Sequence, residues 1–272
     1  MEAQFELLSE MAKNGDKLNF GQDFFVKFYQ AFLYSDRWQQ YFKGVGTTLL
    51  VTAIALVLGV VLGAIVAMIR VGHAQQKPHH RNPILGVLNA VCQVYVTVIR
   101  GTPMMVQLLI MSMVIFASSR NFTMVGALAL GINSGAYVSE IIRGGLMAVD
   151  PGQMEAGRSL GLNYMTTMFE IIIPQAIRSI LPALGNEFIM LLKDSSLITV
   201  IGGKELLYAA QGVMNRTYEA MFPLLGVAAI YLVLVMLFRP GGIFGRWEFS
   251  LTRALEKLTG RGTVKAKAEK GA

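Results

Sequence analysis

Long apolar runs divide the chain into segments separated by short polar stretches. Four of these runs contain no charged residue, at 44–69, 101–119, 121–139 and 220–238. An apolar run of about 18 residues or more is long enough for a helix to cross the hydrocarbon core of a bilayer. The pattern therefore predicts a membrane protein whose spanning elements are helices.

One apolar region is interrupted before its end. It extends from about 84 to 116, and the segment Arg100-Gly101-Thr102-Pro103 lies inside it. Proline lacks a backbone donor and disfavours helix at the residue before it. We therefore expect a break at Thr102, with the second span lying mainly after the break.

Five spans are predicted in all. Besides 44–69 and the interrupted region, they are expected at 123–147, 179–203 and 220–238. In the first span Gly59, Gly63 and Ala67 form a ridge of small residues, which suits close packing against another helix. The fold class is thus an all-α membrane protein with five transmembrane helices.

The first 43 residues are polar and mixed in charge. Their last part, FFVKFYQAFLYSDRWQQYF at 24–42, places aromatic residues at helical spacing. This composition is typical of an amphipathic helix in the headgroup region, and it fits a helix packed on protein equally well. The start of the chain has neither a basic segment nor an apolar core, so no cleavable signal peptide is expected.

Composition supports a membrane protein. Charged residues make up 15% of the chain, whereas soluble domains average about 25%. The net charge of +7 does not alternate with aromatic residues as on a nucleic-acid surface, so no nucleic-acid partner is expected. The lone Cys92 excludes an intrachain disulfide and a cysteine-based zinc site.

The basic residues predict the orientation, because cytoplasmic loops collect lysine and arginine. The segment from 239 to the end carries eight bases, Arg239, Arg246, Arg253, Lys257, Arg261, Lys265, Lys267 and Lys270, against three acids, Glu248, Glu256 and Glu269. With five spans, a cytoplasmic tail also places the basic segments 70–83 and 143–178 inside and the N-terminus outside. We divide the chain into an N-terminal segment (1–43), a transmembrane domain (44–245) and a basic cytoplasmic tail (246–272).

A short helix is predicted in the cytoplasmic loop at 150–162. Asp150 suits the N-cap and Pro151 the first helical position. Leu160 and Gly161 would end the helix, since glycine readily adopts the left-handed conformation. The result is a capped helix parallel to the membrane with its charges toward the cytosol.

This loop resembles the EAA motif of ABC-importer permeases. Glu155-Ala156-Gly157 is followed after three residues by Gly161, after nine more by Ile171, and then by Ile173-Pro174. Gly157 stands for the second alanine of the motif and Ile173 for its leucine. Three further stretches are similar to the polar amino acid permeases, relatives of the histidine and glutamine importers: RGTPMMVQL at 100–108, SGAYVSEIIRGG at 134–145 and GNEFIMLLKDSSL at 185–197.

The resemblance, which covers about 44–245, implies the type I importer permease (MetI-like) fold in a bacterial plasma (inner) membrane. It implies a coupling helix whose contact with an ATPase depends on Asp150, Glu155, Ala156, Gly157 and Gly161. The implied partners are a dimer of ATPase subunits, a second permease subunit, identical or homologous, and an extracytoplasmic solute-binding protein. The chain has no G-x-x-x-x-G-K-[ST] loop, so ATP is expected on the partner, with no cofactor bound by this chain and no enzymatic activity.

Ionisable residues inside spans are the candidates for a solute pathway, because each costs about 2.5–3.5 kcal/mol to insert. They are Glu140, Glu187, Lys193 and Asp194, together with the hydroxyl of Tyr137. Glu187 and Asp194 share a helix face, and Glu140 is spaced to pair with Arg143. A second interpretation stays open, in which these charges balance one another and shape the packing.

Two other classes of function were weighed against a permease. An intramembrane hydrolase lacks support, because His73, His79 and His80 lie in one polar loop without an H-E-x-x-H pattern, and no catalytic or metal site is predicted. An ATP-independent channel or scaffold fits the spans but leaves the EAA spacing unexplained. The sequence thus predicts the permease subunit of an ATP-driven ABC importer for polar amino acids, without fixing the charge of the solute.

Overall fold

The chain is helical throughout the part that the computed structural model describes, residues 1–14, 16–76 and 82–238. The predicted tail at 246–272 lies outside these residues. In chain order the elements are α1 (Glu2–Lys13), α2 (Phe20–Phe32), η1 (Tyr34–Asp36), α3 (Trp38–Ala74), α4 (Pro83–Gly101), α5 (Met104–Ile110), η3 (Met111–Ile115), α6 (Phe122–Met147), α7 (Pro151–Ser159), α8 (Tyr164–Thr167), η4 (Met168–Ile172), α9 (Ile173–Asp194), η5 (Ser195–Ile201), α10 (Leu206–Thr217) and α11 (Met221–Phe238).

Five stretches in this part of the chain are long and apolar enough to cross a membrane. They are Tyr34–Ala74, Pro83–Gly101, Phe122–Met147, Tyr164–Ile201 and Met221–Phe238. The predicted count of five is confirmed. Two of the stretches are longer than one bilayer crossing requires, because α3 continues from an interfacial turn and α9 is joined to η4 and η5.

The second span lies before the predicted break, so the expectation that it lies mainly after Thr102 was wrong. The helix α4 occupies Pro83–Gly101, and Thr102 has an extended backbone as predicted. The Asn82 side chain accepts a hydrogen bond from the Ile84 amide at 2.9 Å, and Pro83 fills the first turn. This cap starts a full helix at the beginning of the apolar region. Only the short α5 and the π-turn η3 follow the break.

The predicted ridge of small residues on α3 packs against α6. A side chain added at Gly59 would lie 2.7 Å from the Ser134 hydroxyl oxygen, and one added at Gly63 would lie 2.7 Å from Val138 Cβ. Ala67 on the same ridge is fully buried. Close backbone approach of this kind is the usual basis of helix association in membranes. The α3–α6 pair is the most extensive helix contact in the described fold.

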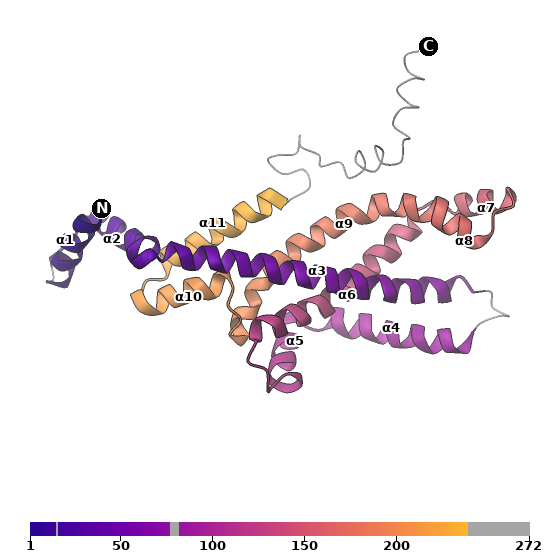
Figure 1. The fold of residues 1–272 in the computed structure, drawn as a ribbon, viewed down its shortest axis with the longest axis horizontal. Helices are drawn as coiled ribbons and strands as arrows, with labels where there is room; N and C mark the ends of the chain where they lie inside the picture. Colours follow the sequence, from indigo (N-terminus) through magenta and orange to yellow (C-terminus); the bar gives the residue numbers. More distant parts are fainter. Residues whose placement is uncertain (15, 77–81, 239–272) are drawn as a thin grey trace, which may run out of the picture.

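The two ends of the molecule carry different elements (Figure 1). The end of α3, the start of α4 and the helices α7 and α8 gather at one end, whereas α1, α2 and α10 lie at the other. The Tyr164 hydroxyl donates to the Gln75 side chain, which joins α8 to the turn after α3. We call the α7 end the inner end and the α10 end the outer end. The two basic segments that the sequence placed on one side thus meet at one end.

The N-terminal helices pack on the protein through their aromatic side chains. Phe5 of α1 stacks on Tyr29 of α2 with ring centroids 4.7 Å apart, and Phe24 meets Phe222 of α11 at 4.9 Å. Phe20 and Phe42 remain exposed. One face of the aromatic segment therefore packs on protein, and the other is free for the interface.

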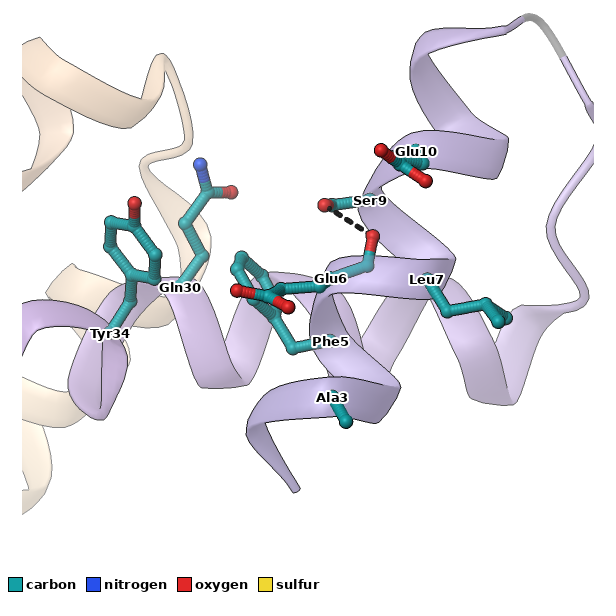
Figure 2. Close-up of a pocket in the computed structure, with 8 residues that line it drawn as sticks. All are labelled: Ala3, Phe5, Glu6, Leu7, Ser9, Glu10, Gln30 and Tyr34. Atoms are coloured by element: carbon teal, nitrogen blue, oxygen red, sulfur yellow. Dashed lines mark hydrogen bonds between the residues drawn. The ribbon is translucent and has the colours of Figure 1, made fainter.

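A hollow lies between α1 and α2 (Figure 2). Its volume is about 720 Å³, and Glu6, Glu10, Gln30 and Tyr34 are among the residues that line it. The Ser9 hydroxyl donates to the Glu6 backbone oxygen at 2.9 Å within α1. Its lining combines the carboxylates of Glu6 and Glu10 with the apolar side chains of Ala3, Phe5 and Leu7.

Candidate functional site

The helix α7 forms as the sequence predicts. The Asp150 carboxylate accepts a hydrogen bond from the Gly152 amide at 2.8 Å, and Pro151 opens the helix. The Leu160 amide donates to the Ala156 carbonyl at 3.1 Å, and Gly161 follows with φ +82°. A residue with a Cβ is strained at that angle. Asp150 and Gly161 thus fix the two ends of the helix.

Gly157 holds α7 against α8. It is the buried residue of α7, and a side chain added there would lie 2.6 Å from Thr167 Cγ2. Thr167 is fully buried, and its hydroxyl donates to the Asn163 carbonyl at 3.0 Å. At this alanine position of the EAA pattern, the Thr167 side chain occupies the space that a Cβ would need, which fits a glycine.

The solvent face of α7 carries the remaining coupling candidates. Glu155 and Ala156 are exposed, and so is Arg158. Apolar side chains continue this surface, with Leu160 81% exposed and Met165 58% exposed. An exposed apolar patch bordered by charges is typical of a protein-binding site. Of the five coupling candidates, Asp150, Gly157 and Gly161 therefore determine the ends and the packing of α7. The other two, Glu155 and Ala156, are exposed on its surface.

Glu140 is bound by two arginines. Arg143 donates to its carboxylate from Nε at 3.0 Å and from Nη2 at 2.7 Å, so the predicted pair forms. Arg70 of α3 also donates to Glu140. The three side chains tie α3 to α6 near the inner end, and the carboxylate oxygens already have strong partners.

Glu187 lies where α3, α6 and α9 cross. It is 9% exposed and accepts a hydrogen bond from the Ser134 hydroxyl at 2.7 Å. Ser134 in turn contacts the Gly59 position of α3. The Glu187 carboxylate is therefore buried between helices of one subunit. Its partner Ser134 lies on a different face of α6 from Glu140.

Lys193 and Asp194 lie near the end of α9. Lys193 is exposed and Asp194 is half-buried. No ion pair within 4 Å joins either of them to another described residue. Neither residue therefore forms an ion pair within the described part of the chain.

Arg100 is a polar residue that sequence reasoning did not place in the pathway. Its guanidinium lies 5.2 Å from the centre of the Tyr137 ring, which brings α4 and α6 together through a cation–π contact. The side chain is exposed, and no carboxylate lies within 4 Å of it in the described parts of the chain. A signal was present: an arginine inside an apolar region with no acid at helical spacing.

The side chain of Gln107 stabilises the break in the helix after α4 by hydrogen bonds. Its Nε2 donates to the Ile99 carbonyl and to the Thr102 hydroxyl, both at 2.7 Å, and its Oε1 accepts from Asn133 of α6 at 2.9 Å. The Gln107 side chain thus supplies the hydrogen bond that the Ile99 carbonyl cannot receive from Pro103, which has no N–H. Broken helices are stable in membranes only when such groups are satisfied.

Glu205 is a second residue that the sequence analysis missed. It is 1% exposed, and its carboxylate accepts from the Tyr231 hydroxyl at 2.7 Å, the Tyr208 amide at 2.9 Å and the Thr48 hydroxyl at 3.4 Å. Thr199 also donates to it. One carboxylate therefore joins α3, η5, α10 and α11. Its place at the start of α10 was visible in the sequence, but these partners were not.

Comparison with known proteins places the chain among membrane transport components. Residues 83–239 match the family described as "Binding-protein-dependent transport system inner membrane component". A putative glutamine transport system permease protein of Rickettsia bellii is 39% identical over 201 residues, which cover 72% of this chain and 86% of that protein. An arginine transport system permease protein of Bacillus subtilis is 34% identical over 200 residues, or 72% and 85% of the two chains.

Solved structures share the fold. A chain from the crystal structure of an amino acid ABC transporter with histidines superposes with a TM-score of 0.66 and 40% identity, over 74% of this chain and 89% of that one. A chain of the MetNI methionine ABC transporter in an inward-facing conformation gives a TM-score of 0.62 at 20% identity, over 76% and 94% of the two chains. The second likeness concerns the fold alone.

Proposed function

Because the chain belongs to the family of binding-protein-dependent transport system inner membrane components, we propose that it is the permease subunit of an ATP-driven ABC importer for polar amino acids. Relatives named for glutamine and arginine transport support this class of solute. The observation that carries the proposal is α7, a helix capped at both ends that presents Glu155 and Ala156 at the inner end of the fold.

The contacts of α7 allow it to pass a displacement on to the neighbouring helices. Gly157 packs tightly on Thr167, so a push on the exposed face moves α8 with α7. From there η4 and α9 continue without a break in the chain, and α6 precedes α7 after a short turn. Closure of an ATPase pair against α7 would therefore tilt α6 and α9 together.

The partners follow from this arrangement. An ATPase dimer docks at the α7 end, which we place in the cytoplasm, and a solute-binding protein meets the α10 end outside. The N-terminus then lies outside and the C-terminal tail lies in the cytoplasm. A second permease subunit, identical or homologous, supplies the other half of the pathway. ATP is bound and hydrolysed by the partner, which fits a sequence without a G-x-x-x-x-G-K-[ST] loop.

The pathway requires groups for both charges of an amino acid. Arg100 is exposed and has no carboxylate partner among the described residues, so it suits the carboxylate of the solute. Asp194 is half-buried without an ion pair and suits the ammonium group. Tyr137 orients Arg100 through its ring. Lys193 is a further exposed charge, whereas Glu140 and Glu187 hold helices together.

Uptake measurements test the pathway assignment. Arg100→Gln is expected to weaken the apparent affinity for the solute in uptake by the reconstituted transporter, because the charge facing the carboxylate is lost. Lys17→Gln, at an exposed position away from the spans, is the matched control. Unchanged solute affinity in Arg100→Gln would remove this residue from the pathway.

Purification from the native membrane tests the function itself. We expect a tagged chain, extracted in mild detergent, to bring with it an ATPase subunit that mass spectrometry identifies. Gly161→Asp is expected to insert normally but to lose coupled uptake, since aspartate destabilises the left-handed end of α7. Recovery of the chain alone, with full uptake in Gly161→Asp, would favour an ATP-independent channel or scaffold.

A further inference from the structure

A cleft at the outer end has features that the transport proposal does not use. It lies between the start of α3 and α10 and has a volume of about 330 Å³. Three exposed cations line it, Lys43 from α3, Lys204 from the turn before α10 and Arg216 from α10. The side chains of Gln40 and Tyr208 add polar groups at its edge. Residues far apart in the sequence thus bring three positive charges to one place.

These three cations have no ion-pair partner among the described residues. None of the three cations has a carboxylate within 4 Å in the parts of the chain that the structure describes. Glu205 reaches the cleft, but its carboxylate is 1% exposed and is bound by hydroxyl groups and a backbone amide. Glu219, at the same end, pairs with Lys27 at 3.7 Å. The cleft therefore has a surplus of positive charge that an anion from outside would stabilise.

A fourth cation, Arg37, lies at the same end of the fold but does not line the cleft. Arg37 is 7% exposed, donates to the Gln30 carbonyl and lies 5.2 Å from the Tyr34 ring centre. Like charges held together without a carboxylate are typical of an anion-binding site rather than of a packing contact.

The cleft opens at the level of the lipid headgroups. Lys43 directly precedes the charge-free run 44–69. Lys204 comes three residues after one membrane-spanning stretch ends at Ile201, and Arg216 comes five residues before the next begins at Met221. Exposed Trp38 and Phe42 lie at the start of α3, just before Lys43, and such aromatic residues mark the interface. The anions that are abundant at this level are lipid phosphates.

We propose that this cleft binds the phosphate group of an anionic phospholipid in the leaflet at the outer end. Arg216 offers a planar pair of donors to the phosphate oxygens, and Lys43 and Lys204 add two point charges. Ala209 and Gly212 form an apolar wall beside them for the glycerol part of the lipid. At the base of the cleft, a side chain added at Gly44 would lie 2.8 Å from the backbone of Leu206. The bound lipid therefore braces the joint between α3 and α10.

Lipid association measured by electron spin resonance tests this proposal. The full-length chain is reconstituted in phosphatidylcholine bilayers that contain a trace of spin-labelled phosphatidylglycerol or spin-labelled phosphatidylcholine. A basic residue near the surface contributes about 1 kcal/mol to binding an anionic lipid, which is about fivefold in affinity. The wild-type chain is expected to prefer phosphatidylglycerol, and Lys43→Gln with Lys204→Gln is expected to lose most of that preference.

Matched controls separate the site from general charge. The pair Lys17→Gln and Arg120→Gln removes the same charge from exposed positions outside the cleft and is expected to keep the preference. Arg216→Gln is a second cleft variant in case the double variant folds poorly. Inorganic phosphate at matched ionic strength is expected not to displace the labelled lipid, which distinguishes a lipid from a free phosphate ion.

Three results would overturn the proposal. They are equal association of the two lipids with the wild-type chain, equal loss in the cleft and control variants, and displacement by inorganic phosphate. A cleft variant that keeps its lipid preference but loses affinity for a solute-binding protein would assign the cleft to an acidic protein surface instead. The measurement requires neither ATPase nor uptake, so its failure is separate from a failure of the proposed function.

Discussion

At the scale of single residues, the absence of a side chain decides whether α7 can dock on α8. Gly157 is buried against Thr167, and no larger residue fits without moving one of the two helices. Overpacking a close contact of this kind costs about 1–3 kcal/mol. The effect falls on the helix that we expect to meet the ATPase, far from the solute.

We expect Gly157→Val to reduce coupled uptake without preventing membrane insertion. The new methyl groups would displace α7 from Thr167, so coupled uptake should fall while membrane insertion persists. Uptake in vesicles, with the amount of inserted protein measured by immunoblot, checks this. Gly144→Val, at an exposed position with no neighbour within 4 Å, should behave like wild type. Full uptake in Gly157→Val would contradict the tight contact.

Glu205 is the residue on which the outer joint depends. Its carboxylate accepts from groups on α3, η5, α10 and α11. Glu205→Ala leaves buried hydroxyl groups without a partner, each at a cost of about 1–3 kcal/mol. The melting temperature of the purified protein should fall clearly in Glu205→Ala and less in Glu205→Gln, which keeps an acceptor. Equal melting temperatures for the two variants would show that the hydrogen bonds contribute little.

At the scale of elements, contact between α3 and α6 depends on small residues that allow the backbones to approach. Gly59 and Gly63 on α3 receive Ser134 and Val138, and Gly135 on α6 receives Leu62. In lipid no hydrophobic force draws two helices together, so this interlocking has to supply the attraction by packing. Arg70 adds a charged link through Glu140 near the inner end.

A bulky residue on the ridge should therefore push the helices apart. Gly63→Leu would place its side chain within 3 Å of Val138 Cβ, and the expected loss is about 1–3 kcal/mol of stability. Gly46→Leu, on the exposed surface of the same helix with no neighbour within 4 Å, is the control for added volume. Thermal unfolding in detergent compares the two. If both variants melt at the wild-type temperature, the ridge is not an essential contact.

At the scale of the whole molecule, α7 and the outer turns lie at opposite ends (Figure 1). The exposed side chains Leu160 at the inner end and Tyr218 after α10 are 81% and 95% exposed. They serve as reporters of the orientation that the basic residues predict. Cys92 is buried and is the only cysteine of the chain, so a single substitution gives a cysteine-free background.

The orientation can be read by chemical labelling in a Cys92→Ser background. A membrane-impermeant maleimide should label Tyr218→Cys in intact cells from which any outer layer has been removed. Leu160→Cys should react only after the membrane is permeabilised, because α7 is placed in the cytoplasm. The reverse pattern would place the N-terminus inside and would exclude docking of an ATPase on α7.

Local chemistry explains what the sequence alone determined. Five spans, the break at Thr102, the capped helix at α7 and the small-residue ridge all follow from runs of neighbouring residues, whose effects act within a few residues of each other. The EAA spacing predicted the transport class by a different route, through its resemblance to the permeases of ABC importers. The placement of the second span was wrong because a cap at Asn82 outweighed the charge-free run after the proline.

Only the tertiary structure decided which distant groups meet. Glu187 bonds to Ser134, Arg100 lies over Tyr137, and Gln107 closes the break after α4. Glu205 accepts hydrogen bonds from four elements. Three cations from two helices and a turn line the cleft at the outer end. These contacts depend on how the helices cross, and the crossing is set by the summed packing of whole faces rather than by any short motif.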